Sequence, residues 1–274
     1  MPEGSLLRLV VRGARGSMSV SGSEYLRFGG NTSCFHIPLG TNDHLIIDAG
    51  SGLRDVERSL GPGPHHFTFV FTHYHWDHIQ GLPVFAPIYD PATTITFVGP
   101  SSLEHDVEQA LCSVIREPWF PVTLETAPAS IRYRDIKRTL RRGPIALHAT
   151  QLNHPQGVAG FRIDGPTRSV VIATDHEAGD RAADRSLVRL MSGADHLIHD
   201  GQYTTAEYSA RRRGWGHSTP DAAVDAALAG GATRLILTSH DPDHDDSMID
   251  AMVAGARARF PMTSAAYEGL EIDL

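Results

Sequence analysis

The chain has 274 residues, of which 41% are hydrophobic and 20% charged, a balance typical of a globular protein with a sizeable core. Its formal charge is −8 with sixteen histidines counted as neutral, which argues against a general polyanion-binding surface. No apolar run reaches the roughly eighteen residues of a membrane span, and the N-terminus lacks a secretory signal pattern. Two cysteines, Cys34 and Cys112, cannot form a disulfide framework, so we expect a cytoplasmic protein.

The first part of the chain predicts short strands separated by glycine-rich turns. Residues 6–12 and 33–37 have the composition of strands, and a glycine-rich turn lies between them. Residues 45–47 form a third apolar strand that runs into Asp48, which we expect to support a site or fix a loop. A fourth strand, at residues 67–71, leads directly to a cluster of histidines.

The second part alternates strands with helices. Residues 131–165 predict several short strands in a meander. Thr219 has the features of a helix cap, with proline at the first helical position and glycines at 230–231 to end the helix. The alternation across the chain favours one layered α/β domain over residues 1–274.

Four strands share one feature, a histidine or aspartate at or directly after the strand end: His73, Asp175, Asp200 and His240. Ligands of layered α/β proteins gather in loops beyond the carboxyl ends of strands, so these residues are expected to converge. A single histidine in this position is most often structural, whereas several together indicate a site.

The segment His73-Tyr74-His75-Trp76-Asp77-His78 carries the strongest pattern. Imidazole and carboxylate are ligands for zinc, iron or manganese, and the HxHxDH spacing suits two ions. His73 and His75 alternate in an extended loop and can bind one ion. Asp77 and His78 lie at the start of the following helix and can bind a second ion. The motif therefore predicts a dinuclear metal centre.

With this motif, a downstream histidine and aspartate, and a final histidine, the chain resembles the metallo-β-lactamase superfamily. The resemblance implies a four-layer αββα sandwich forming a single domain. It also implies that one metal is held by His73, His75 and His154. A second metal would be held by Asp77, His78 and His240, and Asp175 would bridge the two metals.

Two downstream elements are similar to those of the ribonuclease Z-like and cyclic-nucleotide phosphodiesterase branch, including the anti-Pycsar type. These are Gly216-His217-Ser218-Thr219 and Leu197-Ile198-His199-Asp200, although the family commonly has glutamate where this chain has Asp200. The resemblance implies that His217, oriented by Asp200, acts at the phosphate. Together with Asp77 they are the predicted catalytic residues.

The predicted chemistry is hydrolysis of a phosphodiester. Two divalent ions activate a bridging hydroxide and clamp the phosphate oxygens, and His217 serves as general acid or stabilises the leaving alkoxide. Zinc is the expected metal, with manganese and iron left open.

The substrate is expected to be a small molecule, most readily a 3′,5′-cyclic nucleotide, because residues 100–150 carry no glycine-rich basic arm for a tRNA. Extended nucleic acid and membranes are not expected partners, and the resemblance implies a homodimer. Three alternatives stay open: a ribonuclease Z-like tRNA 3′-processing endonuclease, a lactone or other ester hydrolase, and a non-enzymatic metal-binding sensor.

Seven further histidines have no ligand-like spacing, and we expect them at the surface or in loops: His44, His65, His66, His105, His148, His196 and His244.

Overall fold

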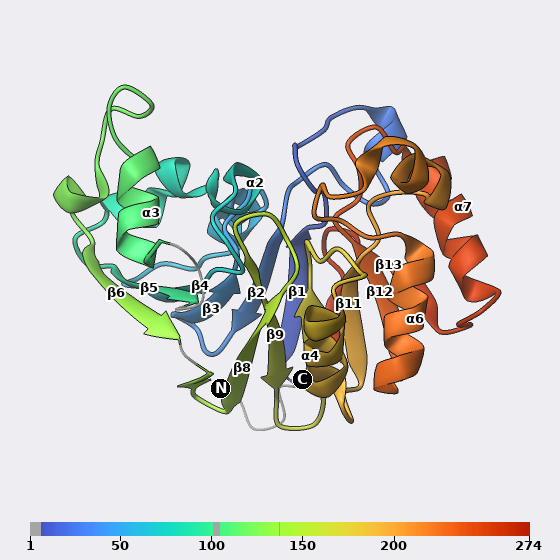
Figure 1. Cartoon of the computed structure of the whole chain (residues 1–274). Coiled ribbons are helices and arrows are strands. Elements are labelled where there is room, and N and C mark those ends of the chain that lie inside the picture. The colour runs from blue at the N-terminus through green and yellow to red at the C-terminus, as the bar shows by residue number, and fades with distance from the viewer. Residues whose placement is uncertain (1–6, 101–104, 137) are drawn as a thin grey trace.

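The computed structural model describes residues 7–100, 105–136 and 138–274. Within them the chain forms two sheets packed face to face, with helices on both outer faces (Figure 1). This is the four-layer α/β sandwich that the sequence resemblance implied, in one domain. In the described part of the chain, no helix is long and apolar enough to cross a membrane.

The first sheet is seven-stranded and mixed, because β1, β2 and β3 pair antiparallel whereas β3 to β6 run parallel. In sheet order its strands are β14 (Glu271–Asp273), β1 (Arg8–Gly13), β2 (Cys34–Pro38), β3 (Asp43–Ile47), β4 (His66–Val70), β5 (Thr94–Pro100) and β6 (Ser130–Ile136).

The second sheet is also seven-stranded, with a parallel half from β10 to β13 and an antiparallel half from β7 to β10. In sheet order its strands are β13 (Thr263–Ala265), β12 (Arg234–Thr238), β11 (His196–Asp200), β10 (Ser169–Ala173), β9 (Val158–Asp164), β8 (Ile145–Leu152) and β7 (Thr139–Arg142).

Helices cover the outer faces of both sheets (Figure 1). The first sheet is covered by α1 (Leu53–Arg58), α2 (Trp76–Ile79) and α3 (Val107–Val114), and the second by α4 (Arg181–Met191), α6 (Pro220–Gly230) and α7 (Asp246–Arg257). Short helical segments lie in the connections: η1 (Ser23–Tyr25), η2 (Leu82–Val84), η3 (Ala86–Tyr89), η4 (Leu124–Thr126), α5 (Thr205–Glu207) and the π-helical η5 (Tyr208–Arg212).

Alternating side chains divide the core into three apolar layers. In β10, Val170 and Ile172 pack between the two sheets, whereas Val171 and Ala173 pack beneath the helices. In β3, Ile46 likewise faces the helices, on the side opposite to its two neighbours. Because successive side chains of a strand point to opposite faces, a strand buried on both faces must be apolar throughout.

One sequence expectation about strands is corrected. Residues 131–165 were expected to form one meander, but β6 pairs in parallel with β5 of the first sheet, and only β7, β8 and β9 form the antiparallel run. The chain passes from the first sheet to the second between β6 and β7, and no local pattern distinguishes such a crossing from a hairpin turn.

The predicted helix start at Thr219 is confirmed. The Thr219 hydroxyl accepts a hydrogen bond from Ala222 N, Pro220 occupies the first turn, and Gly231 ends α6 in the left-handed conformation (φ 71°). His217 lies two residues before the cap residue, and its contact with Asp200 places it at the carboxyl edge of the second sheet.

Candidate metal centre

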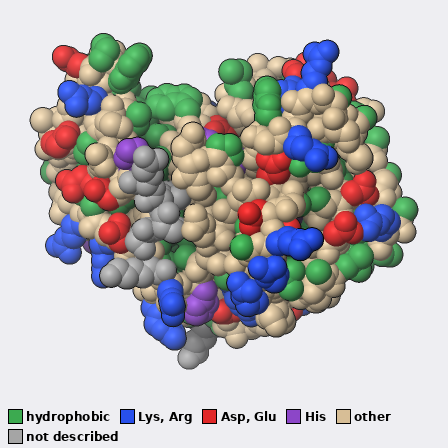
Figure 2. Space-filling view, in the orientation of Figure 1, with side chains coloured by type: hydrophobic (Ala, Val, Ile, Leu, Met, Phe, Trp, Pro, Cys, Tyr) green, Lys and Arg blue, Asp and Glu red, His purple; other side chains and the backbone are tan. Residues whose placement is uncertain are grey.

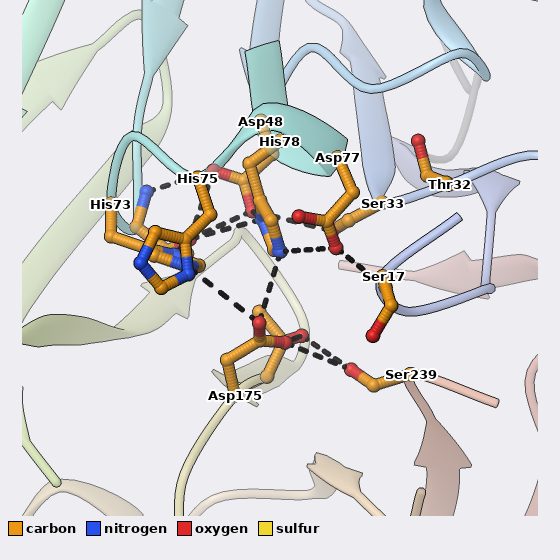
Figure 3. A network of polar contacts seen from close by, with 12 residues as sticks. Ser17, Thr32, Ser33, Asp48, His73, His75, Asp77, His78, Asp175 and Ser239 are labelled. Carbon is orange, nitrogen blue, oxygen red and sulfur yellow. Dashed lines mark hydrogen bonds and ion pairs between the residues drawn. The ribbon is translucent and has the colours of Figure 1, made fainter. Parts of the chain in front are cut away.

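The HxHxDH segment connects β4 to α2 at the carboxyl edge of the first sheet. His75 is the N-terminal cap residue of α2, so His73 and His75 lie in extended chain and Asp77 and His78 in the first helical turn. Figure 3 shows these side chains converging on Asp175, which follows β10 of the other sheet. The site therefore lies where the two sheets meet.

The potential ligand atoms lie close together in the described part of the chain. One group consists of His73, His75 and His154, a second of His73, His78 and Asp175, and a third of His154, Asp175 and His217, with the atoms of each group within 4.8 Å of one another. His75 Nδ1 lies 3.1 Å from His154 Nε2, and His78 Nε2 lies 3.2 Å from Asp175 Oδ2.

Asp77 lies at the edge of this cluster. Its Oδ2 is 3.4 Å from His78 Nε2 and accepts a hydrogen bond from Ser17 N at 2.8 Å. The structure thus brings six of the seven predicted ligands to one place, the six being His73, His75, Asp77, His78, His154 and Asp175.

The two oxygens of Asp175 have different surroundings. Oδ1 accepts hydrogen bonds from the hydroxyls of Thr174 and Ser239, whereas Oδ2 faces His73 Nε2 at 3.6 Å and His78 Nε2 at 3.2 Å. Burial by itself would raise the pKa of Asp175, but the positive charge of His78 and His217 holds the pKa well below its usual range. Asp175 is therefore a carboxylate with one oxygen directed at the cluster.

The cluster fits divalent cations. Among the described residues, His73 Nε2 is buried and finds no hydrogen-bond partner, an arrangement that costs free energy unless a ligand satisfies it. Burial, together with the charge of His78, lowers the pKa of His73 well below its usual value, so its imidazole is neutral and its lone pair available.

Asp48 orients His78 by contacting Nδ1, the ring nitrogen that does not face Asp175. Its Oδ2 lies 2.8 Å from His78 Nδ1, and its carboxylate also accepts hydrogen bonds from Thr72 N and from the Ser33 hydroxyl. A carboxylate in this position fixes which ring nitrogen faces a metal. The expectation that Asp48 supports a site agrees with these contacts.

His240, the seventh predicted ligand, lies outside the cluster. The ligand groups found in residues 7–100, 105–136 and 138–274 do not include it. Its Nε2 hydrogen-bonds to Ala266 O at 3.0 Å, and its ring packs against Phe28 with centroids 5.7 Å apart. Ser239, one residue earlier, has its hydroxyl 3.1 Å from Asp175 Oδ1.

This displacement of His240 has a simple physical reason. β12 ends at Thr238, and Ser239 follows with φ 56°, a left-handed conformation that non-glycine residues seldom adopt. The turn directs the Ser239 hydroxyl to Asp175 and the His240 ring to Ala266 O. The resemblance implied His240 as a ligand, and in this structure its Nε2 is instead hydrogen-bonded to Ala266 O.

His217 and Asp200 form a buried pair beside the cluster. His217 Nδ1 lies 2.6 Å from Asp200 Oδ2, and the other Asp200 oxygen accepts hydrogen bonds from Gln202 N and Ser218 N. His217 packs against His154 with ring centroids 5.2 Å apart. Because Asp200 occupies Nδ1, Nε2 is the nitrogen left for the site.

Two carboxylates keep His217 charged. Burial opposes the imidazolium, but the neighbouring Asp200 and Asp175 outweigh that effect and raise the pKa of His217 to about 9. At neutral pH His217 is therefore a proton donor in the arrangement that the structure shows.

Glu177 is a site residue that the sequence analysis missed. Its carboxylate accepts hydrogen bonds from the Tyr208 hydroxyl, Gly214 N and Gly216 N. Gly216 O in turn lies 2.8 Å from His154 Nδ1. Glu177 thus holds the loop that carries His217 against the cluster, and its only sequence signal is its place two residues after Asp175.

A cavity of about 290 Å³ opens over the cluster. Its lining combines His75, His154 and His217 with polar and aromatic side chains of several loops, among them Ser17, Gln202, Tyr203, Arg212 and Trp215. Figure 2 shows the molecule notched at the upper edge between its two halves, with histidine and acidic side chains visible there.

Four of the histidines expected at the surface or in loops are buried, namely His44, His65, His196 and His244. His36, His44 and His65 form a chain in which His36 Nε2 lies 3.1 Å from His44 Nδ1 and His44 Nε2 lies 3.2 Å from His65 Nδ1. Polar groups that hydrogen-bond to one another are tolerated in a core, so isolation in the sequence did not reveal their burial.

The chain is similar to curated proteins named ribonuclease Z. Among curated proteins, the chain is 25% identical to the ribonuclease Z of Methanothermobacter thermautotrophicus over 279 residues, which covers 84% of this chain and 87% of that protein. It is 34% identical to the ribonuclease Z of Gemmatimonas aurantiaca over 137 residues, covering 50% of this chain and 41% of that protein.

Solved structures share the fold along almost the whole chain. The metallo-β-lactamase fold protein YhfI of Bacillus subtilis superposes with a TM-score of 0.72 at 18% identity, covering 98% of this chain and 99% of that one. A diphosphatase of the PhnP family superposes with a TM-score of 0.70 at 18% identity, covering 98% of both chains. Residues 44–240 match the family described as "Beta-lactamase superfamily domain". The chain therefore belongs to the β-lactamase superfamily.

Proposed function

We propose that the protein is a metal-dependent phosphodiesterase that hydrolyses a small phosphodiester, most readily a 3′,5′-cyclic nucleotide. The observation that carries the proposal is the His217–Asp200 pair, whose 2.6 Å contact leaves His217 Nε2 beside the ligand cluster. Cleavage of a phosphodiester releases an alkoxide that needs a proton, and a charged imidazole fixed by a carboxylate supplies it.

Two groups of residues are proposed to hold the cations: His73, His75 and His154 for one, and Asp77 and His78 for the other, with Asp175 between them. Bound divalent cations would supply activation of water and neutralisation of charge on the phosphate oxygens. His217 then positions and protonates the leaving oxygen. Asp200 keeps Nδ1 of His217 occupied, so the transferable proton lies on Nε2, facing the substrate.

The cavity supports a small substrate. At about 290 Å³ it is at the lower end of the range that holds small ligands. The Arg212 guanidinium lies 4.4 Å from the ring centroid of Trp215, which is 54% exposed. A cation for a phosphate and an exposed aromatic face for a base suit a nucleotide.

The names of the curated relatives favour one alternative, a ribonuclease Z-like tRNA 3′-processing endonuclease. The charge of the chain opposes it. Residues 105–129, which include α3 and η4, carry four acidic side chains against the single basic Arg116. The net charge of −8 would repel the phosphates of a tRNA body, and the basic run from Arg132 to Arg142 lies outside this segment.

A substrate panel on the metal-reconstituted protein tests the proposal. Hydrolysis of cyclic purine or pyrimidine nucleotides, lost in His217→Ala, is the expected outcome. Cleavage of a precursor tRNA without cyclic-nucleotide turnover would establish the endonuclease instead. An acyl-lactone beside bis(p-nitrophenyl) phosphate separates ester from phosphodiester hydrolysis, and tight metal binding without any turnover would indicate a sensor.

Three further features belong to the proposal. Zinc is the proposed metal, with manganese or iron as alternatives that metal analysis of the purified protein distinguishes. A homodimer is proposed from the family resemblance, and light scattering tests it. A cytoplasmic location is proposed from the low cysteine count, and fractionation of the source cell tests that.

A further inference from the structure

The two halves of the proposed metal centre differ in their donors. The first half has three imidazoles, from His73, His75 and His154, whose ligand atoms lie within 4.8 Å of one another. The second half, as proposed, has one imidazole, from His78, with Asp77 Oδ2 3.4 Å and Asp175 Oδ2 3.2 Å from its Nε2. Nitrogen donors therefore dominate the first half and oxygen donors the second.

Ser239 occupies the place from which β12 would supply another donor to the second half. Its hydroxyl lies 3.1 Å from Asp175 Oδ1 and 2.6 Å from the Thr174 hydroxyl, and Figure 3 shows it directed at Asp175. The backbone has the same form at three strand ends around the site, since φ is 58° at Asp48, 55° at Asp175 and 56° at Ser239.

The shared left-handed conformation indicates that the surrounding structure holds Ser239 in a defined orientation, as it holds Asp48 and Asp175. Left-handed conformations of non-glycine residues cost free energy and persist where the surrounding structure holds them in place. At the other two strand ends the turn directs a carboxylate to the cluster or to the back of His78. At Ser239 the same turn presents a neutral hydroxyl, which is a much weaker ligand for zinc than imidazole.

His240 cannot replace Ser239 in this arrangement. The backbone on both sides of its ring is fixed, because His240 N donates to Ala14 O at 2.9 Å and Gly16 N donates to His240 O at 3.1 Å. Its Nε2 is engaged by Ala266 O on the side away from the cluster. Moving the ring to the cluster would break these three hydrogen bonds.

From this asymmetry we propose that the centre is unequal: His73, His75 and His154 hold one cation tightly, and Asp77, His78 and Asp175 hold a second, exchangeable cation. The second position prefers an oxygen-seeking ion such as Mn²⁺, because two of its three side chains are carboxylates. The inference rests on the proposed metal-dependent function and adds that occupancy of the second position follows the free metal concentration.

Metal content measured without any assay of activity tests the inference. The purified protein is loaded with Zn²⁺, passed through a desalting column with a weak chelator, and analysed by inductively coupled plasma mass spectrometry. We expect one retained equivalent per chain. Mn²⁺ added to this species is followed by the loss of its free electron paramagnetic resonance signal, and it should bind one further equivalent reversibly.

Two substitutions at neighbouring positions sharpen the test. Ser239→His should retain two zinc equivalents and bind the second at least about tenfold more tightly, whereas Ser239→Ala should still retain one. His240→Gln, which keeps a donor for Ala266 O, should leave the retained metal unchanged. Circular dichroism and the melting temperature verify that each variant is folded.

The opposite outcomes are equally clear. Two tightly retained zinc ions in the unmodified protein, or loss of one on His240→Gln, would overturn the inference even if Ser239→His failed to fold. Failure to bind any divalent cation would instead overturn the proposed metal-dependent function, so the two failures are distinguishable.

Discussion

His217 Nδ1 lies 2.6 Å from Asp200 Oδ2, and Asp200 is completely buried at the end of β11. Asp200 ends a strand of the second sheet and His217 lies in the loop before α6, and Ser218 N and Gln202 N hold the second Asp200 oxygen in place. A carboxylate fixed in this way determines which nitrogen of His217 faces the substrate.

Removing the His217 imidazole should therefore affect turnover and leave metal binding intact. We expect His217→Ala to lower kcat by about 10²–10⁴-fold, the usual contribution of a positioned general acid. Steady-state kinetics and metal analysis of the same samples measure both quantities. His105→Ala, at an exposed position, is the matched control and should change neither. Loss of a metal equivalent in His217→Ala would mean that His217 is a ligand.

The pH dependence of kcat should reflect the protonation of His217 beside Asp200. The Asp200 and Asp175 carboxylates outweigh burial and raise the pKa of His217 to about 9, so the donor form is present below that pH and is lost as the pH rises through it. Bound cations act in the opposite direction and move this limb to lower pH. Asp200→Asn removes one of the two charges, so its basic limb should lie at still lower pH. An identical basic limb in both proteins would exclude His217 as the titrating group.

Asp48 should govern metal affinity without contacting a metal. Since its carboxylate holds His78 Nδ1 at 2.8 Å, Asp48→Asn should weaken binding at the His78 position by about 10–100-fold, as loss of such supporting carboxylates usually does. Competition with a chromophoric chelator measures this change. Asp55→Asn on α1 is the control, and equal effects of the two substitutions would contradict the assigned role of Asp48.

Arg212 should contribute to substrate binding. It lines the cavity and stacks on Trp215, whereas Arg213 next to it lies over Tyr208. We expect Arg212→Ala to raise KM roughly tenfold, equivalent to about 1.4 kcal/mol of binding free energy. Arg213→Ala should raise KM much less. If both substitutions had the same effect, the positive charge of the whole loop would be responsible and not a contact with Arg212.

The histidine chain beneath the first sheet should make the fold sensitive to acid. Burial, with the charge of His65, lowers the pKa of His44 to about 4, below its ordinary value near 6.5. The unfolded chain therefore takes up the proton first, and this part of the stability is present above pH 6.5 and is lost as the pH falls towards 4.

Urea unfolding at pH 7.5 and pH 5 measures that loss. In His44→Gln the difference in unfolding free energy between the two pH values should shrink by roughly 1 kcal/mol, because glutamine takes up no proton over this range. His66→Gln, at the exposed start of β4, is the control. An unchanged difference in His44→Gln would show that other groups carry the acid sensitivity.

Much of this protein follows from local sequence patterns. The strand at 67–71, the HxHxDH segment after it and the capped helix after Thr219 were all predicted, because strand ends, ligand spacing and helix caps depend on neighbouring residues. The four-layer fold and the membership of the β-lactamase superfamily followed from the resemblance that those patterns carry. The structure also brings six of the proposed ligands close to one another.

Other features depend on contacts between residues far apart in the chain. The sheet to which β6 belongs depends on its pairing with β5. The burial of His36, His44 and His65 depends on the hydrogen-bonded chain that they form. Glu177 gains its role only because the loop at 214–216 folds back onto it.

The end of β12 shows most clearly which features follow from local sequence and which depend on the tertiary structure. The sequence by itself determined that β12 ends at a site, since an apolar run is followed at once by polar residues. Which of those residues faces the site was decided by the left-handed turn at Ser239 and by the hydrogen bonds that hold His240 against Ala14 and Ala266. A shift of one residue reverses the direction of a side chain, and only the tertiary structure records that shift.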